Sequence, residues 1–111
     1  MSHTNEQSQL DHIFTALAHR KRREIAHVLS FKPSTISQLA VKYELSFPAI
    51  HKHIRLLETS KLILKKKSGR TNFIALNQTT LAVGQAWIKK YNTDWGNPEA
   101  SLENYIAKLR E

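Results

Sequence analysis

The sequence contains no cysteine, which excludes disulfide bonds, thiolate metal sites and cysteine nucleophiles. Glycine and proline are scarce, with three of each in 111 residues, so a low-complexity or disordered chain is not expected. No apolar run approaches the length of a membrane span, and the polar stretch before Leu10 lacks the basic-then-apolar pattern of an export signal. We therefore expect a cytoplasmic protein that forms one domain, residues 1–111, around one hydrophobic core.

The sequence patterns of common catalytic sites are also missing. There is no Gly-x-Ser-x-Gly nucleophile setting, and neither the phosphate-loop pattern nor the dinucleotide-binding glycine pattern occurs. A chain of 111 residues without a nucleophile motif leaves little room for a polar catalytic cleft. We expect neither an enzyme nor a bound cofactor.

Acidic residues are sparse in the middle of the chain. The net charge is +8, from 17 Lys and Arg against nine Asp and Glu. Residues 1–18 hold two acids and no base, residues 19–77 hold thirteen bases and three acids, and residues 78–111 hold four of each. A basic middle between neutral or acidic ends indicates a body that binds a polyanion. A merely soluble basic protein would show the same net charge.

Residues 10–30 predict two helices. The second helix, at about residues 19–30, opens with four consecutive cations at the end where they oppose the helix dipole. This unfavourable placement suggests a function, so we expect phosphate contacts from this run, with Arg22 as the candidate; a solvated helix face is the alternative. The apolar residues of the first helix recur at i, i+3, i+4 and i+7: Leu10, Ile13, Phe14 and Leu17.

Residues 34–59 predict two short helices joined by a tight turn. Ser34 or Thr35 can cap the first helix, and the turn falls at Glu44-Leu45. Ser46 suits the N-cap of the second helix, and Pro48 fits its first turn, where no backbone N–H is needed. Two helices with so brief a connection form a helix-turn-helix candidate.

Residues 62–77 predict a β-hairpin. Two β-prone runs, 62–64 and 71–76, flank a turn at Ser68-Gly69. The hairpin tip is the most cationic stretch after the second helix, and its cations are Lys65, Lys66, Lys67 and Arg70. A two-helix turn followed at once by a basic hairpin is the winged helix-turn-helix arrangement, a mainly α fold with a small β wing.

This arrangement suits double-stranded DNA because the major groove admits one α-helix, whose first turns reach the base edges. The wing then lies along the backbone, where its cations meet phosphates. Arg55 can pair with guanine, Lys52 with guanine or phosphate, and His51 can donate or accept. Phe47 or Ala49 can contact a thymine methyl group. The candidate residues on and beside the second helix are Ser46, Phe47, Ala49, His51, Lys52 and Arg55.

Residues 79–111 predict C-terminal helices. Trp87, Tyr91 and Trp95 stand at i, i+4 and i+8, so they share one helix face. Aromatic side chains at this spacing usually pack against protein, which favours a dimer interface or core over a ligand pocket.

Residues 11–25, Leu39-Ala40, residues 45–58 and residues 61–77 are similar to ArsR-type regulators, the arsenical-resistance-repressor family of winged helix-turn-helix proteins. The likeness covers about residues 10–95. It implies a homodimer, paired through the first and last helices, that reads a palindromic operator with half-sites about one DNA turn apart. The dimer contacts implied in this way are Leu10, Ile13, Phe14, Trp87, Ile88, Tyr91 and Trp95.

The metal sites of this family are missing from the sequence. Other members place aspartate and histidine ligands on the C-terminal helix, but no histidine follows His53 here. The chain thus resembles the branch without a metal site, and His53 is interpreted as a packing or phosphate-contacting residue. A site formed between subunits by His3, His12 and others stays an alternative. Metal-sensing members carry cysteines at positions that align with Thr35, Ser37 and Ala40, none of which binds a soft metal.

The leading hypothesis is a homodimeric DNA-binding transcription regulator. We expect it to be a repressor with its own operon as one candidate target, and its effector is unknown. The alternative is a winged-helix module for protein or structured RNA, with only nonspecific affinity for nucleic acid. The two differ in selectivity, because a sequence reader prefers its operator over scrambled DNA by about a thousandfold or more.

Overall fold

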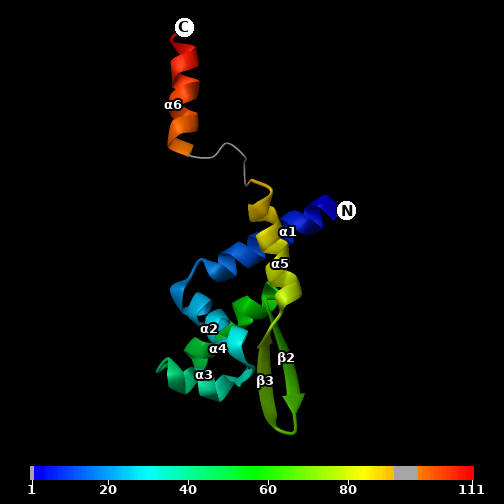
Figure 1. Ribbon diagram of the computed structural model, residues 1–111. Coiled ribbons are helices and arrows are strands. Elements are labelled where there is room, and N and C mark those ends of the chain that lie inside the picture. Colours follow the sequence, from blue (N-terminus) through cyan, green and yellow to red (C-terminus); the bar gives the residue numbers. More distant parts are fainter. Residues whose placement is uncertain (1, 92–97) are drawn as a thin grey trace.

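The computed structural model describes residues 2–91 and 98–111, with side chains for residues 5–91 and 99–111. Within these ranges the chain forms six helices and three short strands (Figure 1). No described helix has the length and apolar character needed to cross a membrane. In chain order the elements are α1 (Ser2–Leu17), α2 (Arg20–Phe31), β1 (Ser34–Thr35), α3 (Ile36–Lys42), α4 (Phe47–Thr59), β2 (Ile63–Ser68), β3 (Thr71–Leu76), α5 (Gln78–Lys89) and α6 (Pro98–Leu109).

One core joins α1 through β3, with α5 packed against α1 and with α6 apart from the other elements (Figure 1). The buried residues of α2, α3 and α4 recur at helical spacing and include Ile25 and Leu29, Ile36 and Leu39, and Ile50, Ile54 and Leu57. The mainly α winged helix-turn-helix fold is confirmed. The fully or nearly fully buried apolar residues are Ile13, Ala16, Ile25, Leu29, Ile36, Leu39, Ala40, Ile50, Ile54, Leu57, Leu62, Ile63 and Ile74.

The predicted helix caps are confirmed. Thr35 begins α3 with a capping box: its Oγ1 accepts from the Gln38 backbone N–H at 3.0 Å, and the Gln38 Oε1 accepts from the Thr35 N–H at 2.9 Å. Ser46 begins α4, and its Oγ accepts from the Ala49 N–H at 3.3 Å. Local side-chain chemistry therefore sets where both helices of the helix-turn-helix begin.

The sheet has the antiparallel strand order β1-β3-β2. β1 is a two-residue strand that no sequence pattern predicts; it pairs Ser34 with Ile74 and thereby ties the start of α3 to the hairpin. The hairpin turn is Gly69-Arg70, one residue later than the predicted Ser68-Gly69, because Ser68 is the last residue of β2. Gly69 alone of this pair has a positive φ, +64°. That combination is typical of a type II′ turn, which matches the twist of the flanking strands.

Two helix boundaries differ from the sequence prediction. α1 begins at Ser2, although the apolar periodicity starts only at Leu10. The helix predicted to carry Tyr91 and Trp95 ends earlier: α5 stops at Lys89, and Tyr91 lies in a turn in which its N–H bonds to the Ile88 carbonyl at 3.1 Å. Trp95 lies outside the described residues.

α5 packs closely on α1 because it carries a glycine at the contact. A Cβ at Gly84 would stand 3.3 Å from the Cγ2 of Ile13, whose side chain is fully buried. The close approach places the aromatic residues at the end of α5 beside those of α1, where the rings of Phe14 and Trp87 meet edge to face with centroids 5.6 Å apart.

We expect Gly84→Val to lower the free energy of unfolding by about 1–3 kcal/mol, because the larger side chain overpacks Ile13. Gly84→Ala serves as the control, since a gain of about 1 kcal/mol in helix propensity offsets its smaller steric conflict. Urea unfolding followed by circular dichroism measures both variants. Equal stability of the valine and alanine variants would contradict the close approach.

Candidate nucleic-acid interface

The turn between α3 and α4 is short because α3 ends in a Schellman motif. The Glu44 N–H bonds to the Val41 carbonyl at 3.2 Å, and the Leu45 N–H bonds to the Ala40 carbonyl at 2.9 Å. Glu44 itself has a positive φ of 52°, a conformation that favours glycine. Ser46, the N-cap of α4, follows Leu45 directly, so a tight turn joins the two helices.

α4 has one buried face and one free face. Ile50, Ile54 and Leu57 point into the core, whereas Phe47, His51, Lys52 and Arg55 are exposed. Within the described residues, the side chains of Lys52 and Arg55 make no hydrogen bond and no ion pair. Phe47, which is 59% exposed, lies parallel to the His51 ring with centroids 5.9 Å apart. The residues predicted to read bases therefore share a solvent-facing surface, apart from the half-buried Ala49 and the capping Ser46.

The cations of the hairpin lie along β2 rather than at its tip, which corrects the sequence prediction. Lys65, Lys66 and Lys67 are strand residues, and only Arg70 belongs to the turn. Lys65 pairs with Ile74 on the core-facing side of the hairpin, and its Nζ lies 3.5 Å from Glu58 Oε1 of α4. Lys66, opposite Phe73, belongs to the other face. The hairpin thus divides its cations between its two faces.

A hollow of about 180 Å³ joins the start of α3, the start of α4 and the hairpin turn. It brings Arg70 into the same concave surface as the two aromatic residues of α4. The helix and the wing are therefore parts of one continuous surface, not two separate basic patches. Residues that line the hollow include Thr35, Ser37, Phe47, His51, Arg70 and Asn72.

Arg22 does not belong to this surface, and its predicted phosphate contact is wrong. The side chain is buried, with 8% exposed. Its Nε donates to the Ala16 carbonyl at 2.7 Å, its Nη2 donates to the Thr15 carbonyl at 3.2 Å, and its Nη1 lies 3.3 Å from Nδ1 of His53. The alternative of a solvated helix face is equally wrong for Arg22, because the guanidinium is used inside the chain.

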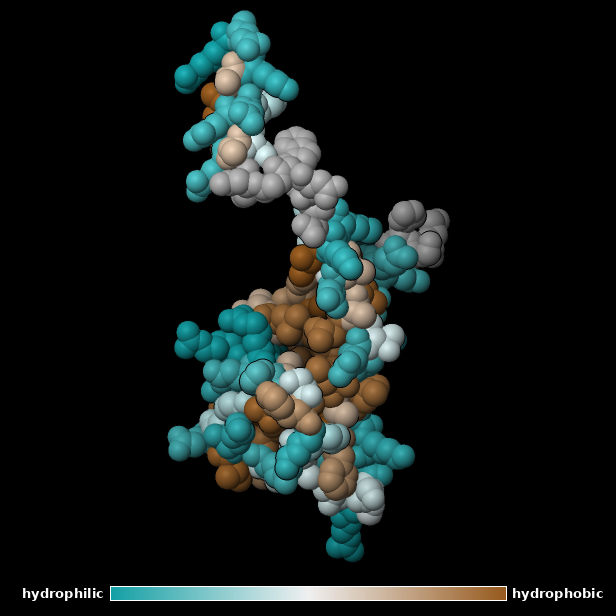
Figure 2. All heavy atoms as spheres, viewed as in Figure 1, coloured by the Kyte–Doolittle hydropathy of each residue, from teal (hydrophilic) through white to brown (hydrophobic). Residues whose placement is uncertain are grey.

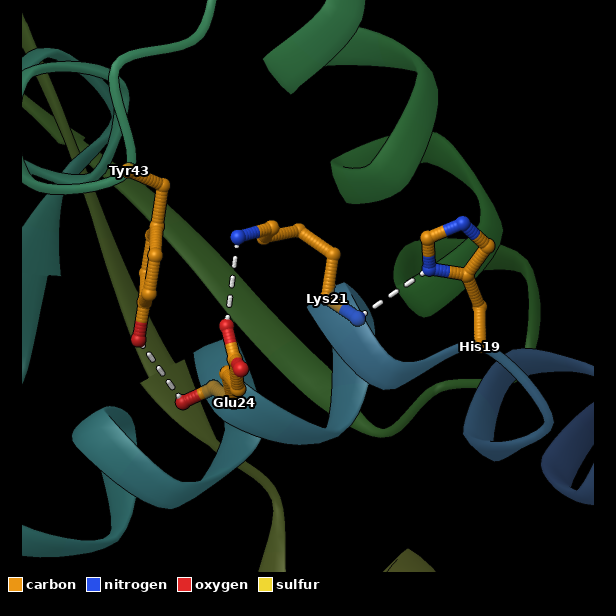
Figure 3. A network of polar contacts seen from close by, with 4 residues as sticks. All are labelled: His19, Lys21, Glu24 and Tyr43. Atoms are coloured by element: carbon orange, nitrogen blue, oxygen red, sulfur yellow. Dashed lines mark hydrogen bonds and ion pairs between the residues drawn. The ribbon is translucent and has the colours of Figure 1, made fainter.

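Two other cations of the same run are also bound within the chain, and Figure 3 shows the contacts of one of them, Lys21. Arg23 donates through Nη1 to the Leu17 carbonyl at 2.8 Å. The Nζ of Lys21 lies 3.3 Å from the Oε2 of the Glu24 carboxylate and 4.8 Å from the centre of the Tyr43 ring. The Tyr43 hydroxyl donates to the backbone carbonyl of Glu24 at 3.1 Å. Burial first, and the Glu24 carboxylate second, raise the pKa of Tyr43. These contacts hold α2 to α3 and leave less of the run free for phosphate.

His53 lies on α4 and packs where α4 meets the start of α2. Its ring lies against that of His19, with centroids 4.8 Å apart. Burial, and then the charges of His19, Arg22, Lys52 and Lys21, lower the pKa of His53. This geometry favours the packing interpretation of His53 over phosphate contact. Within the described residues no three His, Cys, Asp or Glu side chains are placed to hold a metal ion, and the side chain of His3 lies outside them.

The predicted dimer residues divide into buried and exposed groups. Ile13 is fully buried in the core of the protomer, so its predicted role at a dimer surface is wrong. Trp87, Ile88 and Tyr91 are 39%, 59% and 65% exposed. Figure 2 shows hydrophobic side chains gathered where α1 and α5 lie side by side. A groove of about 340 Å³ runs there, lined by Gln7, Leu10, Asp11, Phe14 and Trp87.

Comparison with known proteins identifies relatives, although no family model matches the chain. The HTH-type transcriptional regulator Rv2034 of Mycobacterium tuberculosis is 32% identical over 83 residues, which cover 75% of this chain and 78% of that protein. The transcriptional repressor SdpR of Bacillus subtilis is 24% identical over 82 residues, 74% of this chain and 91% of that protein.

Solved structures that resemble this chain also include transcriptional regulators. A crystal structure of an ArsR family transcriptional regulator is 36% identical with a TM-score of 0.70, and the match covers 76% of this chain and 87% of that one. The homodimeric winged helix-turn-helix DNA-binding domain of Mb0332 from Mycobacterium bovis superposes with a TM-score of 0.64. That match covers 76% of this chain and 80% of the other; at 13% identity it shows a shared fold alone.

The turn between α3 and α4 yields a direct test. We expect Glu44→Gly to raise the free energy of unfolding by about 1 kcal/mol, since glycine adopts the positive φ at this position without steric cost. Glu44→Ala retains that cost and is the control. Urea unfolding compares the two variants, and a glycine variant no more stable than the alanine variant would argue against the left-handed conformation.

Proposed function

The chain belongs to the ArsR family of transcriptional regulators, which are not enzymes, and we propose that two copies of it bind a palindromic operator in double-stranded DNA and repress transcription. In this proposal α4 is the recognition helix and enters the major groove, while the β2–β3 hairpin lies along the backbone. The observation that carries the proposal is the free face of α4, whose cations have no partner within the described residues.

The free face presents a donor-rich stripe to the groove. Phe47, His51 and Arg55 stand at i, i+4 and i+8 and so follow one another along α4. Lys52 is beside this stripe. An arginine pairs with guanine through two hydrogen bonds, and an aromatic edge contacts a thymine methyl group. The start of α4 carries the apolar contact and its middle carries the cations, so we infer that the two ends of a half-site are read by different chemistry.

The hairpin supplies phosphate contacts of unequal strength. Lys66 and Lys67 are exposed and have no ion pair within the described residues, and Arg70 reaches the hollow beside α4. Lys65 has Glu58 as its partner, an exposed pair that contributes little to stability but reduces the positive charge offered to DNA. We therefore rank Lys65 below the other three wing cations as a phosphate ligand.

The second copy would cover the apolar surface of α1 and α5. Leu10 and Phe14 are half-buried there, and Ile88 and Tyr91 are largely exposed. α6 adds a further exposed apolar stripe, consisting of Leu102, Tyr105, Ile106 and Leu109. Large exposed apolar surfaces commonly mark protein–protein contacts, and a twofold dimer places the same patch on both subunits. Dimerisation would set the two recognition helices about one DNA turn apart, which a palindrome requires.

Replacing both free cations of α4, by Lys52→Ala with Arg55→Ala, should abolish operator selectivity and leave the fold intact. Each well-formed base contact contributes about 1–3 kcal/mol of discrimination, so we expect a loss of at least tenfold in affinity. Fluorescence anisotropy on DNA from upstream of the gene, with a scrambled duplex beside it, measures the effect. Lys108→Ala with Arg110→Ala removes the same charge at the end of α6 and just after it, and is the control.

An unchanged affinity in the α4 double variant would contradict the assignment of α4 as the recognition helix. Equal, salt-sensitive binding of the unmodified protein to both duplexes would instead support the interaction-module alternative.

Ile88→Glu should convert the dimer into monomers, because it places a charge in the apolar surface that the second copy would cover. Sedimentation velocity at micromolar concentration measures the change. Val41→Glu is the matched control, since Val41 is an exposed valine of α3, away from α1 and α5. A dimer that survives Ile88→Glu would show that the subunits pair through another surface.

A further inference from the structure

The first turn of α2 is held by two imidazole rings that act as hydrogen-bond acceptors. Nδ1 of His19, the N-cap of α2, accepts from the Lys21 backbone N–H at 3.1 Å. Nδ1 of His53, from α4, lies 3.3 Å from Nη1 of Arg22. Backbone N–H groups and guanidinium groups only donate, so each Nδ1 is the acceptor in its contact.

Arg22 connects this pair of rings to α1. Its other two nitrogens, Nε and Nη2, donate to the carbonyls of Ala16 and Thr15 in the last turn of α1. One buried guanidinium thus binds the helix that carries the expected dimer surface and the helix that is expected to read DNA. Its link to α4 is the contact with Nδ1 of His53, the only hydrogen bond from this guanidinium to α4 among the described residues.

The surroundings of the two rings are cationic. α2 contributes Lys21 and Arg22, α4 contributes Lys52, and α1 contributes carbonyl oxygens. The nearest carboxylate of α2, Glu24, is paired with Lys21. A proton added to Nδ1 of His53 would place a donor against a donor and a positive charge beside a buried guanidinium. The contact with Arg22 therefore requires a neutral His53 ring.

We propose that His53, with Arg22, is a positioning residue that holds the recognition helix in its operator-binding orientation only while the His53 imidazole is neutral, so that acidification releases the operator. This inference rests on the proposed function. Neither His53 nor Arg22 needs to touch DNA, because their effect is transmitted through the placement of α4 relative to α1.

The direction of the pH effect follows from the lowered pKa of His53. At a pH well above the ordinary histidine value of about 6.5, neither the folded nor the unfolded chain binds a proton at this ring, and the contact contributes fully. As the pH falls through about 6.5, the unfolded chain takes up the proton first, so the stability due to this contact declines until the pH lies below the folded value. Each unit by which the pKa is lowered corresponds to a tenfold change in the equilibrium.

The first measurement needs neither DNA nor a variant. An NMR titration of the histidine ring protons in the full chain should give a midpoint for His53 below about 6.5, the value of free histidine. A midpoint at or above that value would overturn the proposal, because the ring would then accept its proton without conflict with Arg22.

The second measurement compares the unmodified protein with His53→Asn. The asparagine Oδ1 takes the place of Nδ1, accepts from Arg22 and does not titrate near neutral pH. At constant ionic strength, we expect the operator affinity of the unmodified protein to fall at least severalfold from pH 7.5 to 5.5, and that of His53→Asn to remain level or rise. His27→Gln, which removes an exposed histidine of α2 outside the proposed DNA-binding surface, is the control and should retain the fall.

Identical pH profiles for the unmodified protein and His53→Asn would overturn the proposal. Affinity for the scrambled duplex should not fall in either, since added protons only strengthen nonspecific attraction to phosphate. A lack of operator selectivity at pH 7.5 would count against the proposed function instead. In that case thermal unfolding still tests the contact between His53 and Arg22. Below about pH 6.5 the unmodified protein should lose more stability than His53→Asn, and an equal loss of stability in the two proteins would refute the proposed role of this contact.

Discussion

The buried guanidinium of Arg22 is the interaction on which the arrangement of the helices depends. It satisfies two carbonyls at the end of α1 and meets His53 of α4, so that three helices converge on one side chain. A buried charge is tolerated only when its hydrogen-bonding groups are satisfied, and each partner here is held in place by its own element. The apolar core supplies the driving force for folding, but apolar contacts are non-directional. The directional contacts of Arg22 define where α4 stands relative to α1.

That constraint separates the cations of the chain into two groups. Arg22, Arg23, Lys21 and Lys65 have partners within the chain, so their charge serves the fold. Lys52 and Arg55 on α4 have no ion pair or side-chain hydrogen bond within the described residues, and they lie on the surface that the hairpin extends. The excess positive charge of residues 19–77 is therefore not uniformly available to a polyanion. Five cations without such partners among the described residues lie on α4 and the wing, where a groove-binding helix needs them: Lys52, Arg55, Lys66, Lys67 and Arg70.

The same packing sets the opposite surface. Gly84 allows α5 to approach α1 until Ile13 is enclosed, and this leaves Phe14, Trp87, Ile88 and Tyr91 as a partly exposed apolar edge. An edge of this kind costs free energy in water unless another surface covers it. In the proposed dimer this edge and the recognition helix are linked through α1 and Arg22, so pairing of the subunits and reading of DNA share one framework.

The sequence by itself determined the features that depend on neighbours a few residues away. The cap at Ser46, a cap at Ser34 or Thr35, a turn that includes Gly69 and the buried stripe of α4 follow from local hydrogen bonds, allowed φ values and helical periodicity. The free face of α4 follows as well, because it is what the buried stripe leaves over. Only the tertiary structure decided which members of a chemically uniform set turn inward. Arg22 and its neighbours in the basic run look alike in the sequence, and the partner that distinguishes Arg22 lies 31 residues away. Likewise, Ile13 lies within the core rather than at its surface because of Gly84, and Lys65 is paired because Glu58 ends up beside the hairpin. Contacts between residues so far apart leave no local pattern, since they exist only once the chain has folded.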